Sequence, residues 1–140
     1  MAFPDDLPVS EYGFPGALRD RLIAAILSGE KTATTSLVLE YDGQQEPLPR
    51  VGDRALVVNS AGEPVGIETI YDVRIAPLGE VDLDHAIAEG EGFTTVAEWR
   101  AGHERFWHSP AYLDELSNPD FRVTDDTLTV LTRFSFRPLR

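Results

Sequence analysis

Residues 22–36, LIAAILSGEKTATTS, carry the change from helix to strand on which the predicted fold depends. Before and within this stretch, apolar residues recur at three- and four-residue spacing, which predicts an amphipathic helix over 16–28. Gly29 follows directly and is well placed to end that helix, because glycine adopts the left-handed conformation without strain. The next residues, 31–41, are rich in threonine and branched aliphatic side chains and predict a strand.

Further along the chain, the pattern predicts a hairpin, helices and a closing strand. Strands are expected at 54–59 and 64–75, joined by the turn residues SAGE. Helices are expected from Asp82 and over 95–107, the second with a capping box at its start, followed by a last strand over 128–137. Because strands and helices do not alternate regularly, this order favours an α+β fold built on a small mixed barrel.

Length and composition suit a single soluble domain. The chain has 140 residues and no cysteine, which excludes disulfides and thiolate metal sites. The proline-rich and acidic start is expected to form an irregular arm, 1–15, ahead of one domain over 16–140. Neither a signal peptide nor a membrane-spanning run is recognised, so a cytoplasmic protein is expected.

The charge balance narrows the choice of partner. The net charge is −12, which disfavours DNA and membranes as partners and fits a small ligand better than long RNA. Among the twelve basic residues, Lys31 is the only lysine. It could satisfy carbonyl groups at the end of the helix. Alternatively, it could face a cleft and act there as a base when neutral, or stabilise an oxyanion when charged.

The residues around Lys31 resemble the ASCH domain family, and in particular its longer bacterial members. The similarity continues in the later stretches 49–53, 59–67, 88–92, 97–100, 103–107 and 130–136. The resemblance implies a PUA-like small mixed β-barrel with flanking helices. It also implies RNA or nucleoside chemistry, because some members remove the acetyl group from N4-acetylcytidine and others are described as ribonucleases.

Three functions follow from that resemblance as alternatives. The chain could hydrolyse a modified nucleoside in its barrel cleft, cleave single-stranded RNA, or bind RNA or a nucleotide without catalysis. No cofactor is implied, and no zinc-binding spacing is present among the histidines. The many carboxylates leave weak binding of a divalent cation open.

The family motif reads here as Gly29, Lys31, Thr34 and, at the position of the family's arginine, Ser36. Ser36 has no guanidinium to grip a phosphate. The resemblance to the amidohydrolase-like members implies Lys31, Thr34 and Glu91 as the catalytic residues. On a regular strand, however, residues 31, 33 and 35 share a face, which favours Thr35 as the neighbour of Lys31.

Thr35, Ser36, Arg133 and His103 are the candidates for substrate binding. Arg133 shares a face with Arg137 and would meet a phosphate if that face lined the cleft, although surface pairing with acids is the preferred interpretation of both arginines.

The later helices hold the remaining candidates. Trp99, His103 and Trp107 recur at four-residue steps, which is typical of a buried stripe, with stacking on a base as the alternative. Glu89 is expected to be a solvated helix end. Glu91 is preferred as the functional acid, because flanking glycines allow its backbone to approach a neighbour closely.

Overall fold

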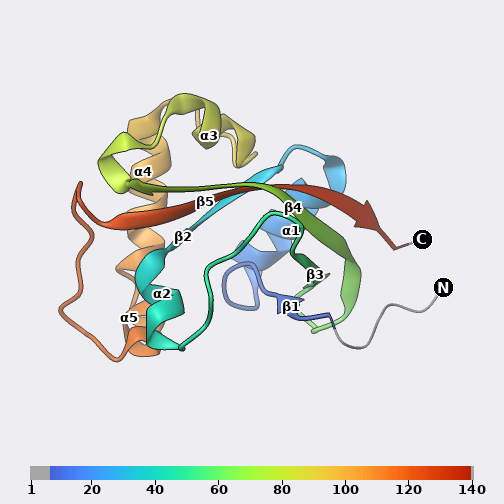
Figure 1. Cartoon of the computed structure of the whole chain (residues 1–140), viewed down its shortest axis with the longest axis horizontal. Helices are drawn as coiled ribbons and strands as arrows, with labels where there is room; N and C mark the ends of the chain where they lie inside the picture. The colour runs from blue at the N-terminus through green and yellow to red at the C-terminus, as the bar shows by residue number, and fades with distance from the viewer. Residues whose placement is uncertain (1–6, 140) are drawn as a thin grey trace.

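The computed structural model describes residues 7–139 and shows one mixed sheet with helices at both of its ends (Figure 1). The strands are β1 (Val9–Ser10), β2 (Ala33–Leu37), β3 (Arg54–Val58), β4 (Pro64–Pro77) and β5 (Leu128–Pro138). The helices are α1 (Ala17–Ser28), α2 (Val38–Gly43), α3 (Leu83–Ala88), α4 (Val96–Trp107) and α5 (Pro110–Leu116), with a short 3₁₀ turn η1 (Leu78–Glu80).

The sheet has the strand order β1-β3-β4-β5-β2. β1 runs parallel to β3, and the other neighbours are antiparallel. β4 and β5 are paired over almost their whole length, whereas β2 covers only residues 129–133 of β5. The second half of β5 therefore has an open edge on the side where β2 ends.

Local signals place most elements where the sequence predicts them. α1 ends at Ser28, and Gly29 takes the left-handed conformation with φ of 86°, as expected. The strand predicted over 31–41 is too long, because the chain turns into α2 at Val38. Glu40 accepts a hydrogen bond of 2.9 Å from the backbone N–H of Leu37, which satisfies one free donor at the start of that helix.

The segment expected as an irregular arm packs against the sheet in its described part, and residues 1–6 of that arm lie outside the described residues. β1 lies in this segment, and Tyr12 is buried. The buried Arg19 of α1 donates hydrogen bonds to the carbonyls of Tyr12 and Gly13, at 3.3 and 2.7 Å. A planar guanidinium suits this role, because several donors point outward from one rigid group.

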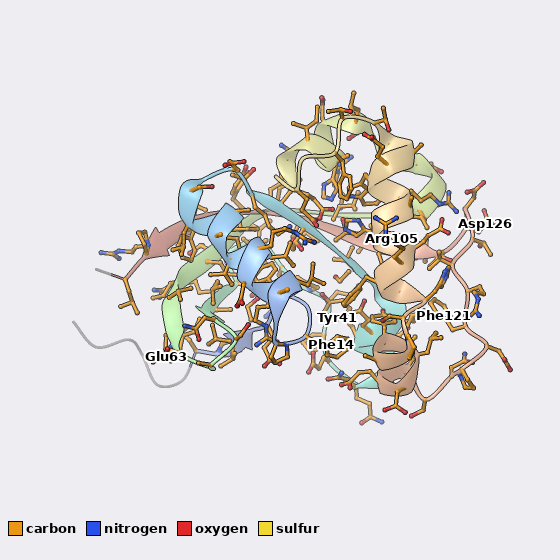
Figure 2. All side chains as sticks on the ribbon, turned by 180° about the vertical axis from the view of Figure 1, so that it is seen from behind. Phe14, Tyr41, Glu63, Arg105, Phe121 and Asp126 are labelled. Atoms are coloured by element: carbon orange, nitrogen blue, oxygen red, sulfur yellow. The ribbon has the colours of Figure 1, made fainter. Side chains whose placement is uncertain are left out.

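Two apolar clusters cover opposite faces of the sheet at opposite ends. α1 packs with Val57 and Phe134 on one face. The helices α3 to α5 cover the other face through Leu37, Leu131 and Trp107. Phe14 joins the second cluster, with 5.8 Å between its ring centroid and that of Phe106 (Figure 2). Lys31 lies in the turn between α1 and β2, and it is 2% exposed.

Within residues 7–139, none of the helices combines the length and the apolar character needed to span a bilayer.

Candidate functional site

Lys31 and Glu89 form an ion pair whose two side chains are each 1% exposed. The distance between Lys31 Nζ and Glu89 Oε1 is 3.4 Å. Nζ also donates to the carbonyl of Ala33 at 2.7 Å, and it lies 5.8 Å from the centre of the Tyr12 ring. Burying two charges costs free energy that their attraction offsets only with further hydrogen bonds, so the surroundings of both groups decide whether the pair is tolerated.

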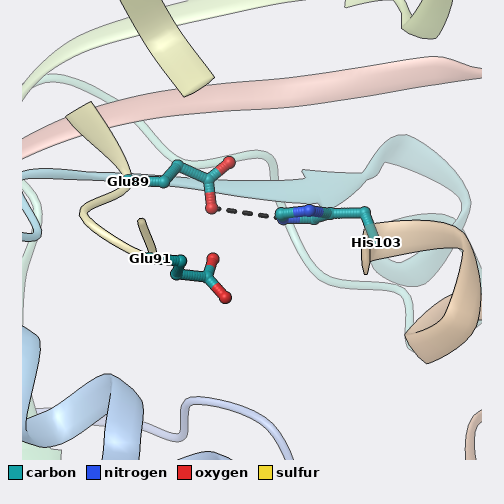
Figure 3. A group of neighbouring side chains, drawn as sticks. All are labelled: Glu89, Glu91 and His103. Atoms are coloured by element: carbon teal, nitrogen blue, oxygen red, sulfur yellow. Dashed lines mark hydrogen bonds and ion pairs between the residues drawn. The ribbon is translucent and has the colours of Figure 1, made fainter. Parts of the chain in front are cut away.

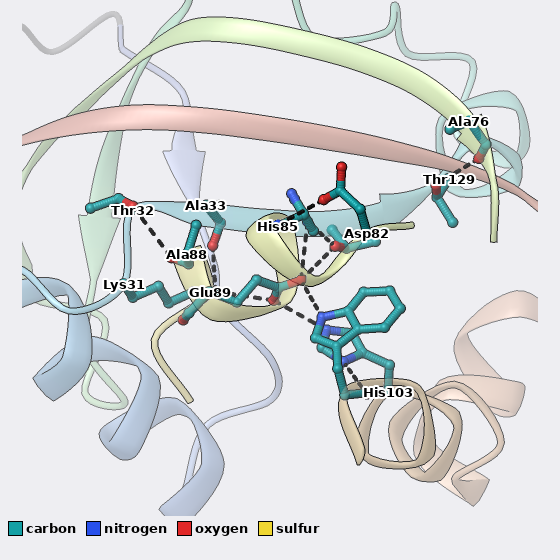
Figure 4. Close-up of polar contacts among 12 residues, drawn as sticks. Lys31, Thr32, Ala33, Ala76, Asp82, His85, Ala88, Glu89, His103 and Thr129 are labelled. Carbon is teal, nitrogen blue, oxygen red and sulfur yellow. Dashed lines mark hydrogen bonds and ion pairs between the residues drawn. The ribbon is translucent and has the colours of Figure 1, made fainter. Parts of the chain in front are cut away.

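Glu89 receives such hydrogen bonds from three elements (Figure 4). Its Oε2 accepts from Thr35 Oγ1 of β2 at 2.6 Å and from the indole N–H of Trp99 of α4 at 2.7 Å. His85 Nε2 of α3 lies 2.7 Å from the Thr35 hydroxyl and 3.3 Å from Oε2. His103 Nε2 of α4 lies 3.2 Å from Oε1. Glu89 is thus the centre of the polar cluster.

The hydrogen-bond pattern assigns the tautomer of His85. Thr35 has one hydroxyl proton, and it donates this proton in the 2.6 Å hydrogen bond to Glu89 Oε2. The hydroxyl oxygen therefore accepts a hydrogen bond from His85 Nε2. His85 Nδ1 has no partner among the described residues, which is less costly for an acceptor nitrogen than for an N–H. The carboxylate of Glu89, and not His85, is therefore the acceptor of the hydrogen bond that the Thr35 hydroxyl donates.

These contacts set the ionisation of the cluster. Burial by itself would raise the pKa of Glu89, but the charges of Lys31 and His103 and the histidine hydrogen bonds outweigh it and hold that pKa well below its usual value. Burial by itself would lower the pKa of His103, yet the negative charge of Glu89 and its hydrogen bond raise it overall. Glu89 is ionised at neutral pH, and His103 is held toward its charged form.

Glu91 lies two residues beyond Glu89, and the two side chains lie close together beside His103 (Figure 3). Glu91 is half-buried, whereas Glu89 is buried. Burial raises the pKa of Glu91, against a smaller opposing effect of the Lys31 charge. Donor atoms of Glu89, Glu91 and His103 lie within 4.8 Å of one another. Because Lys31 already places a positive charge on Glu89, these residues suit proton transfer better than a divalent cation.

The turn that carries both acids is held against the Lys31 segment by Gly90. The backbone N–H of Thr32 donates to the carbonyl of Ala88 at 2.8 Å. Gly90 has φ of 68°, and a Cβ built on it would lie 2.3 Å from the carbonyl oxygen of Glu30. The glycines around Glu91 do mark a close backbone approach, and the approaching residue is Gly90.

Gly90→Ala is expected to lower the free energy of unfolding by more than the roughly 1–3 kcal/mol of a strained backbone alone, because the new methyl group meets the Glu30 carbonyl. Gly92→Ala is the matched control. Gly92 also has a positive φ, 89°, but nothing within 4 Å of its built Cβ. Urea unfolding of both variants gives the comparison. Equal losses of stability would show that the close approach to Glu30 is not a constraint.

The pKa of His103 gives a pH-dependent contribution to stability. A group whose pKa is raised on folding stabilises the fold fully below its unfolded pKa, near 6.5, and loses that contribution as pH rises through the folded value. His103→Gln is therefore expected to cost most stability below about pH 6 and less above pH 8. Urea unfolding across this range tests the expectation. A cost independent of pH would mean that His103 is not charged in the fold.

The structure brings some predicted residues into this cluster and leaves others out. Lys31, Thr35, His103 and Glu91 lie in it or beside it. Thr34 alternates with Thr35 and so occupies the opposite face of β2; its catalytic role stays a prediction.

Two further candidates also lie apart from Glu89. Ser36 Oγ is 2.7 Å from the hydroxyl of Tyr41. In the register of the sheet, Arg133 lies opposite Ala33 of β2 and Asp72 of β4. The surface ion pairs expected for Arg133 and Arg137 are not found within residues 7–139.

Two expectations about α3 and α4 have clear outcomes. Trp99 and Trp107 are 0% and 2% exposed, which confirms the buried stripe and leaves neither ring free to stack on a base. The expectation that Glu89 is solvated is wrong, because α3 ends against Lys31 and Trp99 and shuts water out.

Two buried polar residues near Lys31 were not anticipated. Tyr12 donates a 2.5 Å hydrogen bond to Glu68 Oε1, and burial raises the pKa of Glu68. The distance in sequence between residues 12, 31 and 68 leaves no local signal that could have revealed this grouping.

Comparison with known proteins identifies one domain family. Residues 10–136 match the model of the ASCH domain. A search of curated proteins finds no match.

Solved structures show the same architecture. A protein from Enterococcus faecalis is 28% identical with a TM-score of 0.81, and the alignment covers 99% of this chain and 79% of that one. An ASCH domain from Lactobacillus crispatus is 30% identical with a TM-score of 0.75, covering 92% and 78%. A mutant ASCH protein from Zymomonas mobilis is 13% identical with a TM-score of 0.51, and the alignment covers 88% of this chain and 69% of that one. At this identity the similarity supports the fold alone. The expected α+β, PUA-like barrel with flanking helices is confirmed.

Proposed function

Because the chain belongs to the ASCH domain family, we propose that it binds a modified nucleoside beside the Lys31–Glu89 pair and hydrolyses an amide bond on it. N4-acetylcytidine is the substrate that the family resemblance suggests. The products would be cytidine and acetate.

One observation carries this proposal: a lysine and a glutamate, each 1% exposed, are paired inside a network with Thr35 and two histidines. A buried ion pair stabilises a fold little or not at all compared with apolar side chains of similar volume. Clusters of titratable groups with shifted pKa values gather at functional sites. The residue types therefore favour chemistry over structural support.

The degree of burial indicates the side from which a substrate would approach. Lys31 and Glu89 are shielded, whereas the His103 side chain is 13% exposed and Glu91 is half-buried. A ligand would thus meet Glu91 and His103 first, with the Lys31 charge behind them. A fixed positive charge in a site that excludes water stabilises negative charge that develops on a carbonyl oxygen.

Glu91 is suited to move the proton. A raised carboxyl pKa brings a general base closer to the working pH. In the proposed reaction, water attacks the acetyl carbon while the Glu91 carboxylate takes one of its protons. The bond between the acyl carbon and the exocyclic nitrogen then breaks, and Glu91 returns the proton to the leaving nitrogen. Acetic acid loses its own proton to solvent.

The overall charge favours a nucleoside over long RNA at this cluster. Glu68, Glu89 and Glu91 surround a single lysine, and the chain as a whole carries −12. Carboxylates repel phosphate groups, whereas an uncharged nucleoside meets no such penalty.

Incubation of the purified chain with N4-acetylcytidine tests the proposal, with release of cytidine followed by chromatography. Glu91→Gln is expected to lower the rate by about 100-fold, whereas the exposed Glu115→Gln on α5 should leave it unchanged. Thr34→Ala and Thr35→Ala, compared side by side, show which hydroxyl matters. Absence of cytidine with enzyme and substrate at equal concentrations would refute the hydrolase. Cleavage of single-stranded RNA in its place would support the ribonuclease alternative.

A further inference from the structure

The segment between β1 and α1, residues 11–16, crosses the polar cluster around Lys31 and Glu89 and is called the strap below. Its Tyr12 ring lies 5.8 Å from Lys31 Nζ. Two residues later, the ring of Phe14 packs on Phe106 of α4, with 5.8 Å between the ring centroids. The strap therefore connects the Lys31 end of the cluster to α4.

Phe14 reaches α4 beside His103. His103 and Phe106 are three residues apart in the helix, so their side chains are neighbours on its surface. Figure 3 shows the loop before α1 running below Glu91 and His103. Because residues 11, 15 and 16 of the strap are exposed, the strap is the outer layer of the protein on this side of the cluster.

The strap is fixed at both ends but not by main-chain contacts in between. Just before it, the Leu56 N–H donates to the carbonyl of Pro8 at 2.8 Å. At its end, the Gly16 N–H donates to Ser60 Oγ at 3.0 Å. Among residues 7–139, no main-chain hydrogen bond joins residues 11–15 to another main-chain group. Segments with few main-chain hydrogen bonds open at a lower free energy than the sheet.

Arg19 of α1 provides the polar contacts that hold the strap closed. Its guanidinium donates to the carbonyls of Tyr12 and Gly13, at 3.3 and 2.7 Å, and to that of Asn59 at 3.4 Å. The carboxylate of Glu11 is 3.8 Å away, on a side chain that is 64% exposed. When the strap lifts, water replaces the two strap carbonyls, so opening leaves none of these donors buried and unpaired.

The backbone of the strap has freedom on either side of Phe14. Gly13 and Gly16 have φ of 67° and 133°, which other residues rarely adopt, and glycine passes readily between such conformations. Hinges of loops that open are a few residues of this kind.

Access to Lys31 requires some part of the molecule to move. The side chains of Lys31 and Glu89 are each 1% exposed, so no ligand touches the ammonium group while the strap is in place. The turn that carries Glu91 is held by the Gly90 contact with Glu30, whereas the strap is held by side chains alone. The strap is therefore the segment that can move at the smaller cost.

We propose that the strap is a lid, which opens at Gly13 and Gly16 without unfolding the sheet and so exposes Lys31. Arg19 and the rings of Tyr12 and Phe14 hold it closed. Entry of a nucleoside beneath the strap rests on the function proposed above, whereas the opening itself does not.

Reductive methylation of the lone lysine with isotope-labelled formaldehyde measures this opening, because the Lys31 amine reacts only when it reaches water. Phe14→Ala removes the contact of the strap with α4 and is expected to speed the labelling by about ten-fold. Phe121→Ala is the matched control and should label like the wild type. Phe121 is also partly buried and packs on the same apolar cluster, but it lies outside the strap (Figure 2). Equal acceleration by the two variants would overturn the proposal.

The dependence of labelling on urea tests the wild type directly. Opening of the strap exposes little surface, so the labelling rate should stay nearly flat at low urea, where global unfolding rises steeply. A rate that follows global unfolding from zero urea upward would overturn the lid. In the flat range, Arg19→Gln is expected to speed labelling, whereas Arg21→Gln at an exposed position of α1 should not. Urea unfolding verifies that both variants fold, and equal labelling rates would show that Arg19 does not hold the strap.

Cytidine separates the lid from the proposed function. A nucleoside that binds beneath the strap is expected to slow the labelling of Lys31 in the wild type. Acceleration by Phe14→Ala without protection by cytidine would support the lid and count against entry of a nucleoside. Protection by cytidine with equal labelling in the two phenylalanine variants would support the nucleoside site and overturn the lid.

Discussion

Glu89→Ala is expected to destabilise the fold by about 3–5 kcal/mol, the cost of removing one partner from a buried ion pair. Lys31 would lose its counter-charge in a place that water does not reach. The Trp99 indole N–H would also lose its acceptor, which adds an unsatisfied buried donor. Urea unfolding followed by tryptophan fluorescence measures the effect, because both tryptophans are buried in α4.

Two further variants separate the ion pair from general damage to the core. Glu89→Gln keeps the shape and removes only the charge, so it should retain part of the stability. The double variant Lys31→Met with Glu89→Leu removes both charges together and is expected to recover most of the loss. Lys31→Met and Glu89→Leu are also measured one at a time. If their separate losses of stability simply add in the double variant, the two side chains do not interact, and the assignment of Glu89 as the centre of the cluster is wrong. Glu115→Ala, on the surface of α5, should change stability by less than about 0.5 kcal/mol.

The elements with strong local signals were predictable from the sequence. α1 and its end at Gly29 follow from apolar spacing and from the need for a left-handed residue. The hairpin of β3 and β4 follows from its turn residues. α2 was missed because Val38 and Leu39 extend a run of strand-forming residues. Its position is supported by Glu40, which caps the helix and accepts a hydrogen bond of 2.7 Å from Tyr112, 72 residues away.

The candidate site was predictable only in part, for the same reason. The lone lysine and the glycines around Glu91 point to a turn that the structure does place against the Lys31 segment. Glu89 was assigned to solvent, because an acid at a helix end in an acidic chain is usually exposed. Its burial depends on Lys31, 58 residues earlier, and on Trp99 of the next helix. The residue pattern within one segment carries no information about contacts between residues so far apart in the sequence. Strand alternation, in contrast, does favour Thr35 over Thr34, and the structure shows Thr35 hydrogen-bonded to Glu89.

Lys31→Met is expected to lower nucleoside hydrolysis by about 100- to 1,000-fold, the usual effect of losing one stabilising charge at a reacting oxygen. Lys31→Arg should be nearly as inactive, although it keeps the charge. The space between the Ala33 carbonyl and Glu89 holds a compact ammonium that is 2% exposed, and the larger planar guanidinium cannot occupy it without moving Glu89. Rates are compared with the stability of each variant, so that loss of folded protein is not mistaken for loss of chemistry.

Because Lys31 is the only lysine, the burial of its side-chain amine can be measured by chemical labelling. Reductive methylation with isotope-labelled formaldehyde marks only the Lys31 amine and the N-terminal amine. In the folded protein the Lys31 signal is expected to appear far more slowly than in urea, because its side chain is buried. Glu89→Gln should speed the labelling without unfolding, since it removes the charge that holds the ammonium in place. Rapid labelling of the native wild type would show that Lys31 is exposed, and it would remove the basis for a shielded positive charge at the site.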